Sequence, residues 1–198
     1  MLKRNHILFW ILIILSSCEK EFKVHGYEKF KIDKNINKNS AFHIMNKNAE
    51  FDFGYRFRQI QKNQKRSNNL NITTELGGIK NNYKKFNSQS YFLNDFENKK
   101  TDTLLILVDN FDGYSGIGVN LKIYKKLFKQ DYTESSDVIV SNKKRDSVIV
   151  IENELVLNKI SYKIGDSIHG YLNLKMIKNE EKISAKGYFR TKISKGYF

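Results

Sequence analysis

The chain of 198 residues contains no proline and a single cysteine, and these shortages exclude several classes of protein. One cysteine cannot form an intramolecular disulfide, so a disulfide-stapled fold and a cysteine-rich zinc module are both excluded. No glycine-rich phosphate loop, HExxH metal motif or GxSxG nucleophile elbow occurs in the sequence. The common signatures of nucleotide-binding proteins, metalloproteases and α/β-hydrolases are therefore missing.

Aromatic and basic residues, in contrast, are abundant. Aromatic residues make up 13% of the chain, whereas a disordered protein would be poor in Phe and Tyr, so a folded domain is expected. An excess of 35 Lys and Arg over 21 Asp and Glu gives a formal net charge of +14. This charge suits contact with a phosphate-rich lipid or polysaccharide surface, and it is equally compatible with a solvated lysine-rich surface.

The first 17 residues have the arrangement of an export signal. Lys3 and Arg4 precede nine apolar residues, Ile7 to Leu15. As a helix this run would span about 14 Å, roughly half of a bilayer core. The sequence therefore predicts a cleaved signal peptide and not a membrane-spanning helix.

The tetrad Leu15-Ser16-Ser17-Cys18 follows the apolar run and resembles the lipobox of bacterial lipoproteins, in which an apolar residue and two small residues precede a cysteine. The resemblance implies cleavage between Ser17 and Cys18 and attachment of lipid to the Cys18 thiol. Two or more acyl chains anchor a protein stably. We therefore expect a lipid-anchored protein of the cell envelope, at the outer membrane, facing the periplasm or the surface. The alternative is an ordinary signal peptide followed by an incidental buried cysteine.

Three parts are predicted along the chain: the signal peptide (1–17), the lipidated cysteine with a tether rich in Lys and Asn (18–40), and one β-rich domain (41–198). Within the tether, Phe30 and Ile32 alternate with lysines and have the pattern of a short strand.

Most of the remaining chain has the signature of β-strands. Alternating polarity or short apolar runs predict strands within 50–57, 104–108, 119–123, 138–140, 148–151, 160–164, 168–176 and 183–193. Without proline, the turns must be made by Asn, Asp and Gly. The expected fold is all-β, an antiparallel β-sandwich or a related β-rich barrel, with room for a short helix.

Two segments near the C-terminus predict a hairpin whose register follows from side-chain size. If residues 168–176 and 183–193 pair so that paired numbers sum to 359, large inward residues meet small ones, as where Gly170 faces Phe189. A slip by one residue would turn Arg190 into the core. The other inward pairs of this register are Leu172 with Gly187 and Leu174 with Ala185.

The outward residues of the same hairpin form a candidate binding face, which consists of Tyr171, Tyr188, Lys186, Arg190 and His169. An aromatic pair ringed by basic groups can bind sugars or a partner protein. Alternatively, the second sheet or the N-terminal half of the chain covers this face, and the tyrosines are core residues with their hydroxyls at the edge. His169 is expected to be solvated.

Nothing in the sequence indicates catalysis or metal binding. The four histidines have no spacing typical of a metal pair or of a nucleophile with its base. The acidic turn 109–113 fails as a calcium loop, because the first ligand position would be Val108. We predict no catalytic residue, no metal and no cofactor.

Loose motifs in the C-terminal half carry a second resemblance. They are Gly113-Tyr114, the apolar run 148–151, and the glycine-aromatic stretches 168–171 and 185–189. With these, residues 119–193 are similar to the C-terminal part of uncharacterised Bacteroidota-type lipoproteins. Since that family has no assigned activity, the resemblance implies β architecture and an envelope location only.

These features predict a non-catalytic binding module, anchored to the membrane through Cys18, for an anionic glycan or another envelope protein. The alternatives are a structural or accessory subunit of an envelope assembly, and a hydrolase whose site the sequence does not reveal. Arg56 and Arg58 alternate with aromatic residues, as in some nucleic-acid binders. An exported protein seldom meets nucleic acid, so no such partner is expected.

The lipobox assignment predicts the mass and location of the mature protein. Protein extracted from membranes is expected to begin at Cys18 and to carry two or three acyl chains. The Cys18→Ser variant is expected to be unacylated and to leave the membrane fraction. Intact-mass spectrometry and fractionation of both proteins check this, and a soluble, unacylated wild-type protein would contradict the assignment.

Overall fold

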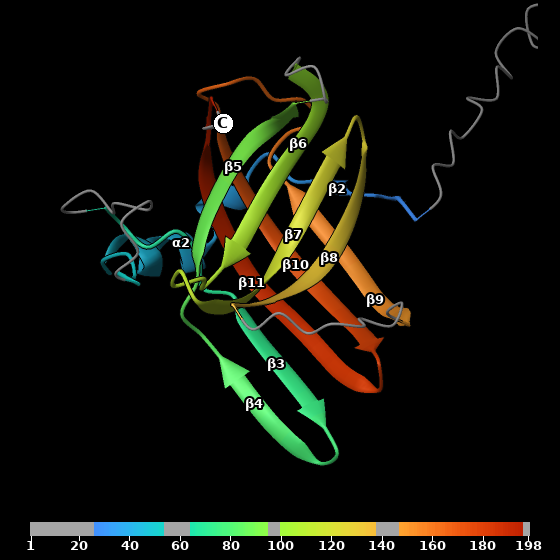
Figure 1. The fold of residues 1–198 in the computed structure, drawn as a ribbon. Coiled ribbons are helices and arrows are strands. Elements are labelled where there is room, and N and C mark those ends of the chain that lie inside the picture. The colour runs from blue at the N-terminus through green and yellow to red at the C-terminus, as the bar shows by residue number, and fades with distance from the viewer. Residues whose placement is uncertain (1–25, 54–63, 95–99, 138–146, 196–198) are drawn as a thin grey trace, which may run out of the picture.

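The computed structural model describes residues 26–53, 64–94, 100–137 and 147–195. This part of the chain is mostly β, with one sheet of 11 strands and one short α-helix, so the expected all-β class is confirmed (Figure 1). The sheet is not closed into a barrel. The strands are β1 (Glu28–Lys29), β2 (Lys31–Ile32), β3 (Asn71–Leu76), β4 (Ile79–Tyr83), β5 (Asn87–Asn94), β6 (Lys100–Asp109), β7 (Ser115–Tyr124), β8 (Leu127–Ser136), β9 (Val148–Leu157), β10 (Ser167–Lys178) and β11 (Glu181–Ser194). The helices are the 3-10 turn η1 (Ile36–Lys38) and α2 (Ser40–Asn46).

The sheet is folded over so that its two halves face each other. Its strand order is β1-β8-β7-β6-β5-β11-β10-β9-β2, and β3 and β4 continue from β11 as a side branch. Neighbours are antiparallel except for β11 with β5 and β2 with β9. In Figure 1 the half made of β5 to β8 lies in front of the half made of β9 to β11.

Both halves contribute to one hydrophobic core. The predicted central strand 104–108 is β6, which lies between β5 and β7. Alternate residues of β7 and β10 point inward, as their period-2 pattern predicted. The core includes Ile106, Val119, Leu121 and Phe128 from one half and Leu155, Leu172, Leu174 and Phe189 from the other.

The register of the β10–β11 hairpin is the predicted one. Gly170 pairs with Phe189, Leu172 with Gly187, and Leu174 with Ala185. The Phe189 ring lies directly on Gly170, where an added Cβ would overlap with the ring. Glycine is therefore required at position 170 to make room for the buried phenyl group.

Strand β11 connects the two halves of the sheet. It pairs antiparallel with β3 through Lys182 to Lys186 and parallel with β5 through Ile193 and Ser194. Between these pairings, residues 67–69 take the neighbouring position: the Asn69 amide donates to the Tyr188 carbonyl (3.0 Å) and the Arg190 amide to the Ser67 carbonyl (2.7 Å). The backbone groups of β11 are thus paired along most of its length.

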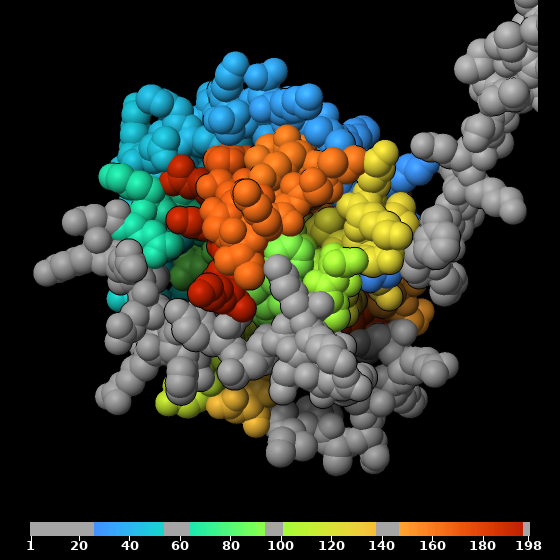
Figure 2. Space-filling view, turned by 90° about the horizontal axis from the view of Figure 1, so that it is seen from above, coloured from blue at the N-terminus to red at the C-terminus, as the bar shows by residue number. Residues whose placement is uncertain are grey.

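The N-terminal segment, residues 26–46, is part of this domain. Strand β1 pairs with β8 and β2 pairs with β9, and Phe30 lies between these two short strands while Ile32 ends β2. The predicted alternation does not form one strand with a single inward face, because Phe30 is buried whereas Ile32 is 46% exposed. Phe30 is buried in the main core. Seen from above, this segment (blue to cyan) lies along one side of the molecule, next to the orange chain around the β9–β10 connection (Figure 2). From Glu28 onward, the stretch assigned to a tether lies against the sheet.

Three predicted strands are wrong or lie partly or wholly outside the described residues. Residues 50–53 do not form a strand. The Glu50 carboxylate accepts the backbone amides of Phe51 (3.1 Å) and Ser67 (2.8 Å), which in a sheet would donate to a neighbouring strand. Residues 54–57 lie outside the described residues. The alternating stretch 160–164 is a loop between β9 and β10. The predicted strand 138–140 also lies outside the described residues.

Replacement of Gly170 by alanine tests the packing of the hairpin. Because the new methyl group would overlap with the Phe189 ring, Gly170→Ala is expected to lower the free energy of unfolding by about 1–3 kcal/mol. In the double variant Gly170→Ala/Phe189→Leu the loss should be smaller than the sum of the single losses, since the smaller side chain frees space. Denaturant unfolding of the four proteins measures this, and strict additivity would contradict the contact.

Candidate functional site

The outward side chains of β10 and β11 form an aromatic surface. The rings of Tyr171 and Tyr188 lie side by side, with centroids 5.0 Å apart and planes inclined by 51°. His169 is paired with Arg190 on one side of the tyrosines, and Asn173 is paired with Lys186 on the other. The structure therefore places all five residues of the predicted binding face on one hairpin, in the order that the register required.

Helix α2 covers part of this face. The Phe42 ring meets the rings of His169 (5.1 Å) and Tyr188 (5.6 Å) edge-on. Asn39 caps the helix by accepting the Ala41 amide (3.0 Å), and its side-chain amide donates to the Tyr188 hydroxyl (3.0 Å). The N-terminal part of the chain is thus the cover that the alternative interpretation required. Both tyrosines remain half-exposed beside it.

An open pocket of about 370 Å³ lies between η1 and the two tyrosines, and we call it the tyrosine pocket. Ile36, Val156 and the tyrosine rings supply apolar surface. Polar side chains from the N-terminal segment supply the rest. The residues that line the pocket are Asp33, Asn35, Ile36, Lys38, Asn39, Val156, Tyr171 and Tyr188.

Several polar groups of the tyrosine pocket have unused hydrogen-bonding capacity. Within the described part of the chain, the Tyr171 hydroxyl, the Asn35 side-chain amide and the Lys38 ammonium have no hydrogen-bond or ion-pair partner. Asp33 uses Oδ1 to accept the Asn35 backbone amide (2.8 Å), which fixes the turn into η1. The pocket can therefore offer donors and a carboxylate acceptor to a bound molecule.

His169 is not solvated as expected. It is half-buried beneath Phe42, because α2 folds back over this part of the hairpin. Burial lowers the pKa of the His169 imidazole below its ordinary value, and the neighbouring Arg190 guanidinium lowers it further. A neutral imidazole is thus favoured in the folded protein.

Arg190 holds segments together and does not line the tyrosine pocket. Its guanidinium donates to the Arg66 carbonyl through Nε (3.2 Å) and Nη2 (3.0 Å), and to the Asn46 side chain at the end of α2. Lys186, in contrast, is exposed. Of the predicted binding face, only Tyr171 and Tyr188 line the pocket.

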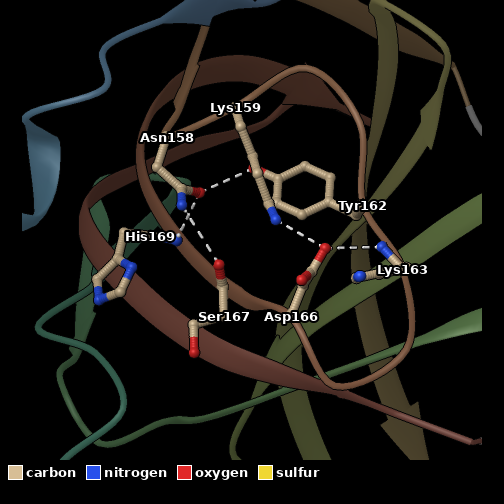
Figure 3. A network of polar contacts seen from close by, with 7 residues as sticks. All are labelled: Asn158, Lys159, Tyr162, Lys163, Asp166, Ser167 and His169. Carbon is tan, nitrogen blue, oxygen red and sulfur yellow. Dashed lines mark hydrogen bonds and ion pairs between the residues drawn. The ribbon is translucent and has the colours of Figure 1, made fainter.

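The connection between β9 and β10 holds a second polar cluster (Figure 3). The Asn158 side chain accepts the Tyr162 hydroxyl (2.9 Å) and the His169 backbone amide (3.0 Å), and donates to the Ser167 carbonyl (3.3 Å). Asp166 pairs with the Lys159 ammonium (2.6 Å) and accepts the Lys163 amide (2.8 Å).

These partners lie in the loop and at the start of β10, and the hydrogen bond and ion pair with Lys159 lower the pKa of the Asp166 carboxyl. The Asn158 amide and the Asp166 carboxylate are thus engaged in shaping the loop and in joining it to β10.

Sequence reasoning missed the pocket residues of the N-terminal segment, Asp33, Asn35, Lys38 and Asn39, because they lie in the stretch assigned to a tether. The available signal was short: Asn39 precedes a helix whose apolar residues Phe42 and Met45 are three apart. Nothing in the sequence indicates that this helix returns to β11.

The described residues contain no group of three His, Cys, Asp or Glu side chains that could hold a metal ion. In the same part of the chain, no helix has the length and hydropathy needed to cross a membrane. Comparison of the chain with protein-family models, curated proteins and solved structures gives no match. The functional proposal below therefore depends on the geometry of the site and on the sequence.

The Asn158 cluster gives a prediction about stability. Asn158→Ala removes the partner of the partly buried Tyr162 hydroxyl and of the His169 backbone amide. It is therefore expected to lower the free energy of unfolding by about 1–3 kcal/mol. Asn82→Ala, at an exposed position of β4, is the matched control and should change stability by less than about 0.5 kcal/mol. Equal effects of the two variants in thermal or denaturant unfolding would show that the cluster contributes nothing.

Proposed function

We propose that this protein is a lipid-anchored envelope protein that binds an anionic glycan in the tyrosine pocket without transforming it. The observation that supports this most directly is the meeting of two tyrosines with unused polar groups in one hollow. The pocket of about 370 Å³ is within the size range of small-ligand sites. Sugars need such a mixture, because their rings carry apolar C–H faces between hydroxyl groups.

The roles of the pocket residues follow from their chemistry. The rings of Tyr171 and Tyr188 offer apolar surface to the C–H face of a sugar, and the Tyr188 hydroxyl is already bonded to the Asn39 amide. Asn35 and Asp33 can exchange hydrogen bonds with sugar hydroxyls. Lys38 is exposed and unpaired among the described residues, so it is the group that would meet a carboxylate or phosphate of the ligand.

The predicted lipid anchor supports a ligand close to the membrane. Cys18 lies eight residues before Gly26, where the described chain begins. Eight residues span at most about 29 Å when fully extended. The pocket begins only seven residues further, at Asp33. A glycan at the membrane surface is therefore within reach of the anchored domain.

A second candidate function, an accessory subunit that docks another envelope protein, is favoured by one edge of the sheet. The apolar side chains of Val148, Ile149, Val150 and Ile151 are 41–60% exposed. In the described structure, β9 is paired with β10 along its length, but β2 covers its other side only at Val156 and Leu157. A free apolar edge of this kind is a place where a partner can add a strand.

Variants of the tyrosine pocket test the proposed function. Tyr171→Ala removes one aromatic surface, and Lys38→Gln removes the cation. Each is expected to weaken binding of an acidic oligosaccharide by about 10-fold or more, whereas only Tyr171→Ala should weaken binding of a neutral one to the same degree.

Calorimetric titration with oligogalacturonate and with maltooligosaccharides, after a screen on a glycan array, provides the measurement. Tyr114→Ala and Lys84→Gln, at exposed positions outside the pocket, are the controls and should bind as the wild type does. Failure of the wild-type protein to bind any glycan would contradict the proposal. Binding that survives both pocket variants would place the site elsewhere.

A further inference from the structure

The wall of the tyrosine pocket and the packing of α2 depend on the same side chains. Ile36, Phe42 and Met45 form a small cluster, separate from the main core, against Val156, Tyr171 and Tyr188. Ile36, Val156 and both tyrosines also line the pocket. A small cluster that is separate from the main core can loosen without global unfolding. Any change that loosens α2 therefore also changes the pocket.

His169 lies beneath this small cluster. Its ring meets Phe42 edge-on at 5.1 Å, and it is half-buried there. The backbone of His169 is bonded to Asn158 through both its amide and its carbonyl, but the imidazole nitrogens have no hydrogen-bond partner within the described part of the chain. In Figure 3 the imidazole points away from Asp166, the carboxylate of the neighbouring loop.

The charged groups around His169 disfavour a positive charge on its imidazole. Arg190 is opposite on β11, and Arg66 and Glu50 belong to the segments that meet Arg190. Glu50 accepts two backbone amides and attracts Arg190, so it is already engaged. On α2, His43 is exposed, and an imidazole supplies no negative charge. A proton on His169 would therefore have no free anion beside it.

We propose that protonation of His169 loosens α2 and η1 from the sheet, so that the tyrosine pocket loses one wall in acid and releases its ligand. The part concerning ligand release rests on the proposed function, whereas the loosening of α2 does not. An envelope protein is exposed to the pH of its surroundings, which gives such a response a use.

The direction of the pH dependence follows from the burial of His169. Burial and Arg190 lower the pKa of His169 in the docked state. After release of α2 the imidazole is expected to titrate near its ordinary value of about 6.5. The released state then binds the proton more tightly. The docking of α2 is thus fully stable above about pH 6.5 and weakens as the pH falls toward the lower value of the docked state.

Hydrogen exchange of the full mature chain tests the loosening without any ligand. Between about pH 7.5 and pH 5, after correction for intrinsic exchange rates, protection of residues 36–46 is expected to fall about threefold or more, while that of β6 stays constant. His169→Gln, which cannot be protonated, should abolish the pH response, and His43→Gln should keep it. A pH-independent wild type, or an unchanged response in His169→Gln, would overturn the proposal.

Two further measurements separate this inference from the proposed function. In the wild-type protein, NMR titration of the imidazole should give His169 a pKa below the ordinary histidine value of about 6.5, and an ordinary or raised value would overturn the inference even if the glutamine variant failed to fold. The affinity for oligogalacturonate should fall about threefold or more between pH 7.5 and pH 5 in the wild type but not in His169→Gln, because the uronate groups stay ionised in this range. Loss of protection without any glycan binding would contradict the proposed function alone.

Discussion

The contact of the Phe189 ring with Gly170 determines how the rest of the molecule is arranged. It fixes the register of β10 against β11, because a slip by one residue would replace this buried pair with a charged side chain. Strand β11 is in turn the only strand, among those described, that joins the two halves of the sheet, through β10 and β3 on one side and β5 on the other. One aromatic ring in the space left by a missing side chain therefore aligns both halves of the core.

The same register decides what appears on the outer face. With Phe189 turned inward, its neighbours Tyr188 and Arg190 must point outward, and they meet Tyr171 and His169 across the hairpin. The N-terminal segment then packs on this face, with Phe42 on the aromatic rings and Asn39 on the Tyr188 hydroxyl. The tyrosine pocket is the space that this segment leaves uncovered. The register of the hairpin therefore determines the position of the pocket and of His169, on which the proposed pH response depends.

The distribution of basic groups is consistent with this division of roles. The Arg190 guanidinium donates hydrogen bonds to the Arg66 carbonyl and to Asn46, and the Lys31 ammonium is paired with Glu154 on β9. Both cations therefore already have partners within the chain. Lys38 at the pocket and Lys186 beside it are exposed. The net charge of +14 indicates an attraction to anionic surfaces but points to no particular site. The cation that could recognise one anionic group of a ligand is Lys38, because it lies in the pocket.

The amino-acid pattern alone predicted the β class, the central position of residues 104–108 and the complete register of the last hairpin, because side-chain size and period-2 polarity are local properties. It also places the expected lipid anchor at Cys18. Local patterns failed at 50–53 and 160–164, where the carboxylates of Glu50 and Asp166 accept the backbone amides of Phe51 and Lys163 that alternation assigned to strands. Three features follow from the tertiary contacts alone: residues 28–46 return to the sheet, half-bury His169 and form a wall of the pocket. These contacts join residues more than a hundred positions apart, and no local pattern encodes such a distance.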